Sequence, residues 1–261
     1  MLSWWGVYSI ESFSFRNGIG RYCSVRGYMF IDSIRLQNFL SYGDNSEPVE
    51  LRNLNIIIGP NGSGKSNLIG AIELLRSTPG DILSCIRDGG GIHEWLWKGN
   101  DCIGGPVAAV GITCKRPHSY PEKLRYQLEF VAAGQRFEIA GEELRDETGV
   151  CHYKGYEDKC MLRTMGEETY LLYGELDPAQ SILSQRKDPD LYPELTYLGN
   201  SLSEIEIYRE WAFGRYTALR SPQKADLPED SLTADGGYFT DSGRVIERCF
   251  NAHSVDSHHT F

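Results

Sequence analysis

One stretch of the chain has residue types and a spacing that suit nucleotide binding. Residues 53–77 read NLNIIIGPNGSGKSNLIGAIELLRS, and the part from Gly59 to Ser66 fits the pattern G-x-x-x-x-G-K-S. Its glycines lack a Cβ, so the backbone can adopt positive φ and turn successive amides inward around a phosphate. Lys65 is a point charge that reaches the β- and γ-phosphates, and Ser66 offers a hydroxyl to Mg²⁺.

The residues on either side of this loop predict a strand before it and a helix after it. Leu54 and residues 56–58 form a short apolar run, which is typical of a buried parallel strand. After the loop, four apolar residues recur at helical spacing and are expected on one face, namely Leu68, Ile69, Ile72 and Leu75. Pro79-Gly80 should end the helix, whose N-terminus would add a positive dipole end. The alternative is a glycine-rich turn before an ordinary helix.

Bulk properties narrow the class of protein. The 261 residues allow one large domain or two small ones, each with a core of its own. The net charge of −10 gives no electrostatic support for wrapping nucleic acid. Seven scattered cysteines without a C-x-x-C pair favour free thiols in a reducing cytoplasm. We find no apolar run long enough for a membrane span and no secretory signal, so a cytoplasmic protein is expected.

The remaining pattern predicts an antiparallel sheet. In residues 29–43, Ile34 and Leu36 alternate with polar neighbours, as in a half-buried strand. Further strands are expected at 107–114, 123–133, 136–140, near 150–153, at 168–173 and within 205–216, with helices at 179–185 and 193–203. Residues 1–28 are interpreted as an N-terminal extension, with a targeting peptide as the alternative, residues 29–218 as the folded lobe, and 219–261 as an irregular tail.

The parts that would complete a hydrolytic site are not evident. The nearest candidate for a Walker B strand is TYLLYGELDP (169–178), where Gly174 interrupts the apolar run and no acidic pair closes it. LTADGG (232–237) is interpreted as a turn rather than a signature motif. DETG (146–149) could suggest a GTPase, but we do not expect the GEEL before it to form a buried strand.

Three other groups of residues have both a structural and a functional interpretation. Four residues of the tail could bind a metal, although solvated side chains are the simpler expectation: His253, Asp256, His258 and His259. Trp95 and Trp97 are expected to pack in the core or at a domain contact rather than to stack on bases. Gln180 and Gln185 are interpreted as surface residues, with contact to Mg²⁺ and the attacking water as the alternative.

Taken with the loop, the segment IDSIRLQNFLSYG resembles the opening of the RecF/SMC branch of ABC-type ATPases. GGIHEWLWKG and IEIYREWAFGRY resemble a group of bacterial predicted AAA/ABC ATPases in that branch. The resemblance implies an α/β fold, with a mixed P-loop NTPase sheet flanked by helices and an antiparallel β-subdomain. It implies that the triphosphate is bound by Gly59, Pro60, Asn61, Gly62, Ser63, Gly64, Lys65, Ser66 and Asn67.

The resemblance also implies the cofactors and the partners. ATP and Mg²⁺ would be bound, with Lys65 as the catalytic residue and Ser66 as the metal ligand. Asn38, Phe39 and Tyr42 would lie near the nucleotide pocket. Relatives continue into a helical lobe with signature and Walker B motifs, which we expect to be missing here, so hydrolysis and an ATP-sandwiched homodimer are in doubt. The alternatives are the non-hydrolytic half of a split ATPase that docks on a separate C-terminal lobe, and an inert fragment. DNA binding is implied by the resemblance alone.

Overall fold

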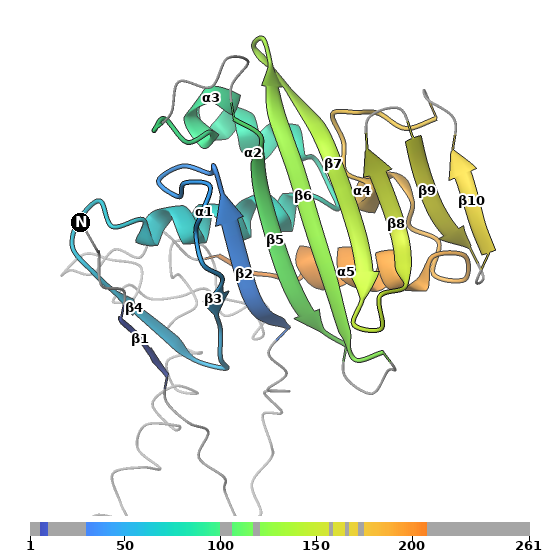
Figure 1. Cartoon of the computed structure of the whole chain (residues 1–261), viewed down its shortest axis with the longest axis horizontal. Coiled ribbons are helices and arrows are strands. Elements are labelled where there is room, and N and C mark those ends of the chain that lie inside the picture. The colour runs from blue at the N-terminus through green and yellow to red at the C-terminus, as the bar shows by residue number, and fades with distance from the viewer. Residues whose placement is uncertain are drawn as a thin grey trace, which may run out of the picture. The chain divides into compact units, whose positions relative to one another are not determined.

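The computed structural model describes residues 6–9, 30–99, 106–116, 121–156, 159–164, 167–171 and 175–207 (Figure 1). Almost all of these belong to one compact unit, Met1–Ile205, and the second unit, Glu206–Phe261, contributes only Glu206 and Ile207. Several predictions fall outside the described residues. They concern most of the 205–216 strand, the tail, LTADGG and the four tail residues that were expected to be solvated, with metal binding as the alternative.

An eight-stranded antiparallel sheet dominates the unit, in the order β10-β9-β8-β7-β6-β5-β2-β3. Its strands are β2 (Ile31–Gln37), β3 (Val49–Glu50), β5 (Ala108–Lys115), β6 (Lys123–Ala133), β7 (Arg136–Asp146), β8 (Cys151–Tyr156), β9 (Lys159–Thr164) and β10 (Glu167–Leu171). The predicted meander is confirmed, although β7 is longer than expected and β9 was not predicted. Gly134 at φ +64° makes the tight turn between β6 and β7 possible.

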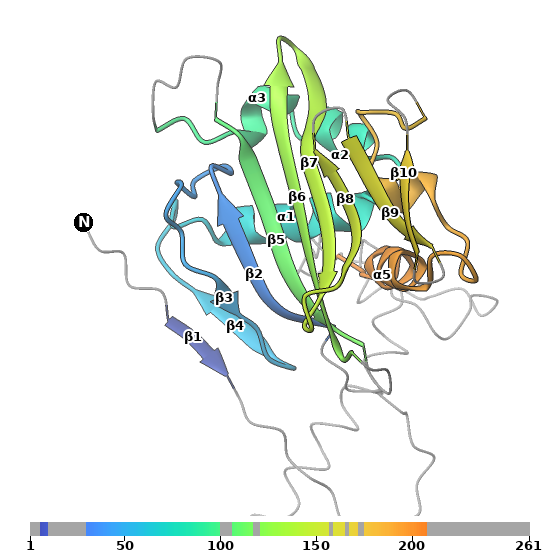
Figure 2. The same cartoon turned by 45° about the vertical axis from the view of Figure 1, so that its right-hand side comes forward.

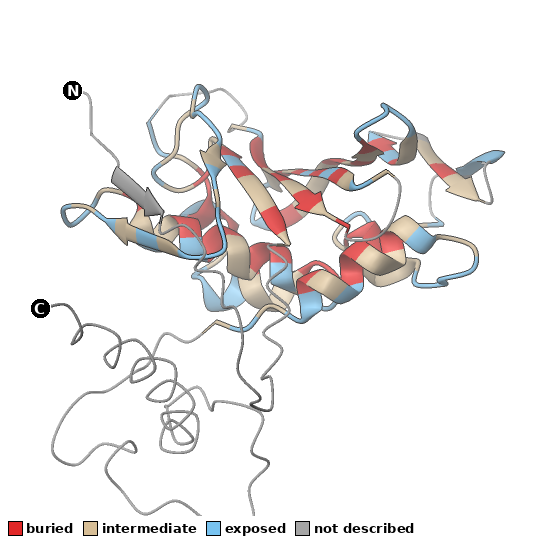
Figure 3. Cartoon of the chain, turned by 90° about the horizontal axis from the view of Figure 1, so that it is seen from below, coloured by how far each residue is buried: buried red, intermediate tan, exposed pale blue. Residues whose placement is uncertain are grey.

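The described helices lie on one face of this sheet, and none of them covers the other, the open face (Figures 2 and 3). They are α1 (Lys65–Ser77), α2 (Ile82–Asp88), α3 (Ile92–Trp95), α4 (Ile182–Gln185) and α5 (Pro193–Ser203). The predicted bounds of α5 are confirmed, whereas α2 and α3 were not predicted. Asp81 caps α2 by accepting a hydrogen bond from the Ser84 amide. None of the described helices is long and apolar enough to cross a membrane.

The core lies between the sheet and the helices. The alternation predicted for β6 is confirmed, because its inward side chains are all buried: Leu124, Tyr126, Leu128 and Phe130. The Phe39 ring packs between Trp95 and Phe130, with centroid distances of 5.7 and 6.3 Å. The core interpretation of Trp95 is therefore confirmed, and Trp97 is half-buried.

The strand before the loop differs from its prediction. β4 (Asn55–Ile58) pairs antiparallel with β1 (Gly6–Ser9) in a separate two-stranded sheet. Leu54, Ile56 and Ile58 are 51%, 44% and 60% exposed. The prediction of a buried parallel strand is wrong for the described residues, because a strand is buried on both faces only when parallel neighbours and two helix layers enclose it.

The predicted buried face of the following helix was also partly wrong. Leu68, Ala71 and Leu75 follow an i, i+3, i+7 stripe and are buried against the sheet, together with Leu74. Ile69 is 39% exposed, because one residue turns the helix by about 100° and places Ile69 beside the stripe. The stop predicted at Pro79-Gly80 is confirmed by the helix end at Ser77.

Candidate nucleotide-binding site

The loop between β4 and α1 has the backbone that its glycines allow. Gly62 and Gly64 adopt φ of +79° and +92°, where a side chain would introduce strain. Gly59 differs from the expectation, because its φ is not in the positive region. Its missing side chain serves close approach instead, since a Cβ there would lie 2.8 Å from the Ser63 Oγ.

The loop leads into the N-terminus of α1, which has no side-chain cap. Gly64 is the N-cap of α1 in the left-handed conformation, so no side chain caps the helix, and its first turn contains no acidic residue. Among the described residues, the amides of Gly62, Lys65 and Ser66 have no backbone acceptor. Free amides at the positive end of a helix dipole form a favourable environment for an anion.

Lys65 lies folded across the loop. Its Nζ donates hydrogen bonds to the carbonyl oxygens of Gly59 and Pro60, both at 2.7 Å, and to the Ser63 Oγ at 3.3 Å. All three donors of the ammonium are therefore used within the loop. A phosphate oxygen would compete with neutral carbonyls for this cation, and charged acceptors form the stronger hydrogen bonds.

The turn after β2 braces the loop from the side. The Tyr42 hydroxyl donates to the Gly64 carbonyl at 3.3 Å, and the Asn67 Nδ2 donates to the Ser41 Oγ at 2.8 Å. Of the three residues that were expected near the pocket, Tyr42 contacts the loop. Phe39 is buried in the core, and the Asn38 side chain donates to the Val107 carbonyl.

A hollow of about 410 Å³ lies beside the first turn of α1. Its walls are Tyr42, Ser46, Glu47, Pro48, Val49, Glu50, Ile57 and Leu68. This volume falls within the range of small-molecule sites, and its mostly apolar lining suits a flat organic group. Ser46 and the residues of β3 could not be predicted from the sequence, because only the folding of the β2–β3 connection brings them beside the first turn of α1.

The two glutamines lie elsewhere. The Gln185 side chain binds the backbone of Asp177 and Gln180, which closes the turn before α4. In Figure 1, α4 lies beyond the C-terminal end of α1, the end opposite to the loop. Since α1 has 13 residues and is about 20 Å long, the structure does not bring either glutamine to Ser66.

Acidic residues near α4 have structural roles. Asp177 accepts a hydrogen bond from the Ala179 amide and so caps the same turn, and Glu175 is exposed. The GEEL segment was expected to be no buried strand, which is wrong: residues 141–144 lie in β7 with Glu142 and Leu144 buried. Asp146 of DETG accepts hydrogen bonds from the amides of Thr148 and Val150, which is turn geometry.

The described residues include no group of three or more His, Cys, Asp or Glu side chains that is placed to hold a metal ion. Ser66 is exposed at the start of α1, so its hydroxyl is open to an ion that arrives with a phosphate. Mg²⁺ commonly keeps several waters and uses few protein ligands beside substrate phosphates, and a lone hydroxyl at this position fits that chemistry.

Comparisons with known proteins identify one family and one solved structure of low similarity. A family model described as "AAA domain, putative AbiEii toxin, Type IV TA system" matches residues 54–236. A solved structure from work on ATP-driven dimerization and DNA stimulated activation of SMC ATPases is similar, with 22% identity and a TM-score of 0.36. That match covers 45% of this chain and 70% of the other. No curated protein matches the chain.

Proposed function

The chain belongs to this AAA-domain family, and from that premise we propose that it binds ATP–Mg²⁺ through Gly59–Asn67 as a P-loop ATPase of the RecF/SMC type. The observation that carries the proposal is the uncapped N-terminus of α1 beneath the Lys65 ammonium. Such an end combines amides without backbone acceptors, a helix dipole and a nearby cation, which are the elements that bind a triphosphate.

In the proposed complex each part of the site has a separate role. Amides of Gly62, Lys65 and Ser66 surround the phosphates, and the Lys65 Nζ leaves the loop carbonyls for phosphate oxygens. The Ser66 hydroxyl would hold Mg²⁺. The apolar hollow between Tyr42 and Leu68 would take the base, because a flat ring gains most from apolar walls.

We propose binding with slow turnover for the isolated chain. Hydrolysis needs a carboxylate that holds Mg²⁺ and another group that polarises the attacking water. The sequence offers Glu175 and Asp177 for these roles, and Asp177 is occupied in the turn before α4.

Calorimetric titration of Mg–ATP into the parent chain and into Lys65→Ala tests the proposal. We expect a loss of affinity of roughly a hundredfold in Lys65→Ala, because a charged hydrogen-bond partner is removed. Lys98→Ala is the matched control, because Lys98 is an exposed lysine that pairs with Glu94 rather than with the loop. Equal affinity in parent and Lys65→Ala would refute the assignment.

The exposed apolar side chains of β4 favour a second candidate function, the non-hydrolytic half of a split ATPase. Leu54 directly precedes the strand that enters the loop, and Ile56 and Ile58 lie on it, where a partner lobe would bury them. ATP turnover by the same preparation separates the candidates. Lys65-dependent turnover by the chain alone would reject the split ATPase, and binding without turnover would favour it. An aggregating chain that binds no ATP would indicate an inert fragment.

A further inference from the structure

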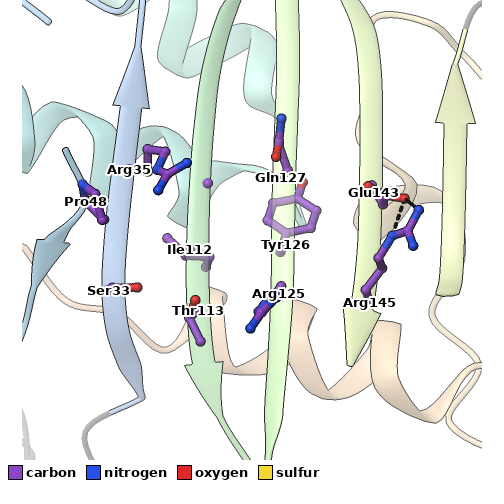
Figure 4. Close-up of a pocket in the computed structure, with 11 residues that line it drawn as sticks. Ser33, Arg35, Pro48, Ile112, Thr113, Arg125, Tyr126, Gln127, Glu143 and Arg145 are labelled. Atoms are coloured by element: carbon purple, nitrogen blue, oxygen red, sulfur yellow. Dashed lines mark hydrogen bonds and ion pairs between the residues drawn. The ribbon is translucent and has the colours of Figure 1, made fainter. Parts of the chain in front are cut away.

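The open face of the large sheet carries a hollow that the nucleotide site does not use. It has a volume of about 380 Å³ and lies over β2, β5, β6 and β7 (Figure 4). The helices, including α1 and its loop, lie behind the opposite face of the sheet. The strands lie between this hollow and α1, and Pro48 lines both this hollow and the one beside the first turn of α1.

Strand register places two rows of polar residues in the hollow. One row crosses the sheet as Ser33, Thr113, Arg125 and Arg145, and the next as Arg35, Gly111, Gln127 and Glu143. Gly111, in the second row, forms the floor of the hollow, since it has no side chain to fill the space. Arg125 stands directly opposite Arg145, an arrangement of like charges that costs stability unless it is compensated.

The cations of this face differ in their partners. Glu143 pairs with Arg145 in the wall of the hollow, and Asp32 pairs with both Lys115 and Lys123 nearby. Among the described residues, neither Arg35 nor Arg125 has an acidic partner. Figure 4 shows their side chains leaning toward β5 from opposite sides, Arg35 from β2 and Arg125 from β6.

The two arginines flank β5, with Arg35 opposite Gly111 and Arg125 opposite Thr113, on strands about 10 Å apart. Guanidinium groups bind phosphate oxygens in a bidentate fashion. A phosphate monoester carries nearly two negative charges at neutral pH and so matches two free cations, while a single carboxylate would match only one. Ser33 and Thr113 add hydroxyl groups beside the same floor.

We propose that this hollow, formed by Arg35, Arg125 and the bare floor at Gly111, is a binding site for a small phosphorylated molecule, separate from the ATP site. A compact ligand fits better than a nucleic-acid strand for two reasons. The Tyr126 ring is buried on the other face, so the hollow has no described aromatic side chain on which bases could stack. Pro48 and the Glu143–Arg145 pair close the hollow at its sides.

The test uses inorganic pyrophosphate as the probe and Lys65→Ala as the background, so that the P-loop does not contribute. Calorimetry on this variant should detect binding. Adding Arg35→Gln and Arg125→Gln should weaken that binding by roughly tenfold or more, because charged donors are lost. The control pair Arg52→Gln and Arg136→Gln removes the same charge from exposed positions outside the hollow and should leave binding unchanged.

Gly111→Val is a second variant that keeps the charge. A Cβ at this position would lie 3.9 Å from the Tyr126 carbonyl and 4.0 Å from the Arg35 Cβ, so the sheet accepts it while the added methyl groups fill the hollow. We expect an unchanged melting temperature and a loss of pyrophosphate binding of roughly tenfold or more.

Three outcomes would overturn the proposal. Equal weakening in the two arginine pairs would mean a general charge effect. No pyrophosphate binding in the Lys65→Ala background would remove the site altogether. Binding of a short single-stranded oligonucleotide that depends on Arg35 and Arg125, without pyrophosphate binding, would assign the face to a nucleic-acid strand instead. Because Lys65 is already replaced, none of these outcomes bears on ATP binding at the loop.

Discussion

The Tyr42 hydroxyl donates a hydrogen bond to the Gly64 carbonyl at 3.3 Å and thereby ties the turn after β2 to the glycine that begins α1. Gly64 has φ of +92° and is the N-cap of α1, so we expect this bond to help hold the loop in its conformation. Tyr42→Phe should weaken Mg–ATP binding by about three- to tenfold, the effect of one hydrogen bond.

Titration calorimetry on folded protein measures this change in affinity. Tyr156→Phe is the control, because Tyr156 lies on β8 with 53% of its surface exposed, on the sheet rather than at the loop. An unchanged affinity in Tyr42→Phe would show that the turn does not position the loop.

Substitutions at two glycines can distinguish the effect of backbone strain on stability from an effect on ATP binding. Gly62 at φ +79° and Gly134 at φ +64° both have open space where a Cβ would be placed. Alanine at either position should cost about 1–2 kcal/mol of unfolding free energy, since left-handed backbone disfavours a side chain. Gly62→Ala should in addition weaken ATP binding severalfold, and Gly134→Ala should not. Equal ATP affinities in the two variants would mean that the loop does not carry the phosphates.

The large sheet could be predicted because its strands alternate strictly. In β6, apolar residues alternate with charged and polar ones from Lys123 to Phe130, and this period specifies both a strand and its inward face. The prediction for β4 was wrong because a short run of apolar residues has no alternation that would indicate which face is buried. It is equally consistent with a buried strand and with the exposed antiparallel edge found at Ile56 and Ile58.

In the candidate site, too, local sequence patterns could be predicted and contacts between distant segments could not. The G-x-x-x-x-G-K-S spacing predicts the loop locally, so Gly62, Gly64 and Lys65 could be placed from the sequence. The contact between Ser41 and Asn67 could not be predicted, because it depends on how the turn after β2 folds back across 26 residues. The pair of arginines on the open face could not be predicted either, since Arg35 and Arg125 are 90 positions apart and come to the two sides of β5 only through the register of the sheet.

The buried carboxyl of Glu142 predicts a pH dependence of stability. Burial raises the pKa of Glu142, and hydrogen bonds from the Ile182 amide, Ser181 and Tyr126 offset this only in part. The folded state therefore holds this proton more tightly than the unfolded chain, so the contribution of Glu142 to stability falls as the pH rises through the folded-state pKa.

Glu142→Gln removes this titration while it keeps the shape of the side chain. We expect the stability difference between the parent and Glu142→Gln to shrink as the pH rises from the unfolded pKa of about 4.3 toward the folded value. Urea unfolding at a series of pH values measures it. A difference that grows with pH would show that the ionised carboxylate is the stabilising form.

Asp146 should have the opposite pH dependence. Its burial acts to raise its pKa, but hydrogen bonds from Thr148, His152 and the Val150 amide outweigh this and hold the pKa below its ordinary value. The folded state thus holds this proton less tightly, so the stabilisation is complete above the unfolded pKa of about 3.9 and is lost as the pH falls through the folded value.

Asp146→Asn should therefore lower the free energy of unfolding by about 1–3 kcal/mol at neutral pH, the cost of disturbing a buried hydrogen-bonded carboxylate. The loss should fade as the pH falls from the unfolded pKa of about 3.9 through the lower folded-state pKa, where the folded carboxylate takes up a proton. Asp188→Asn is the control, because Asp188 accepts hydrogen bonds from the amides of Asp190 and Leu191 in a similar turn but is exposed. If denaturant melts show the same loss at acidic and neutral pH, the charge of Asp146 does not stabilise the turn, and its role is that of a neutral hydrogen-bond acceptor.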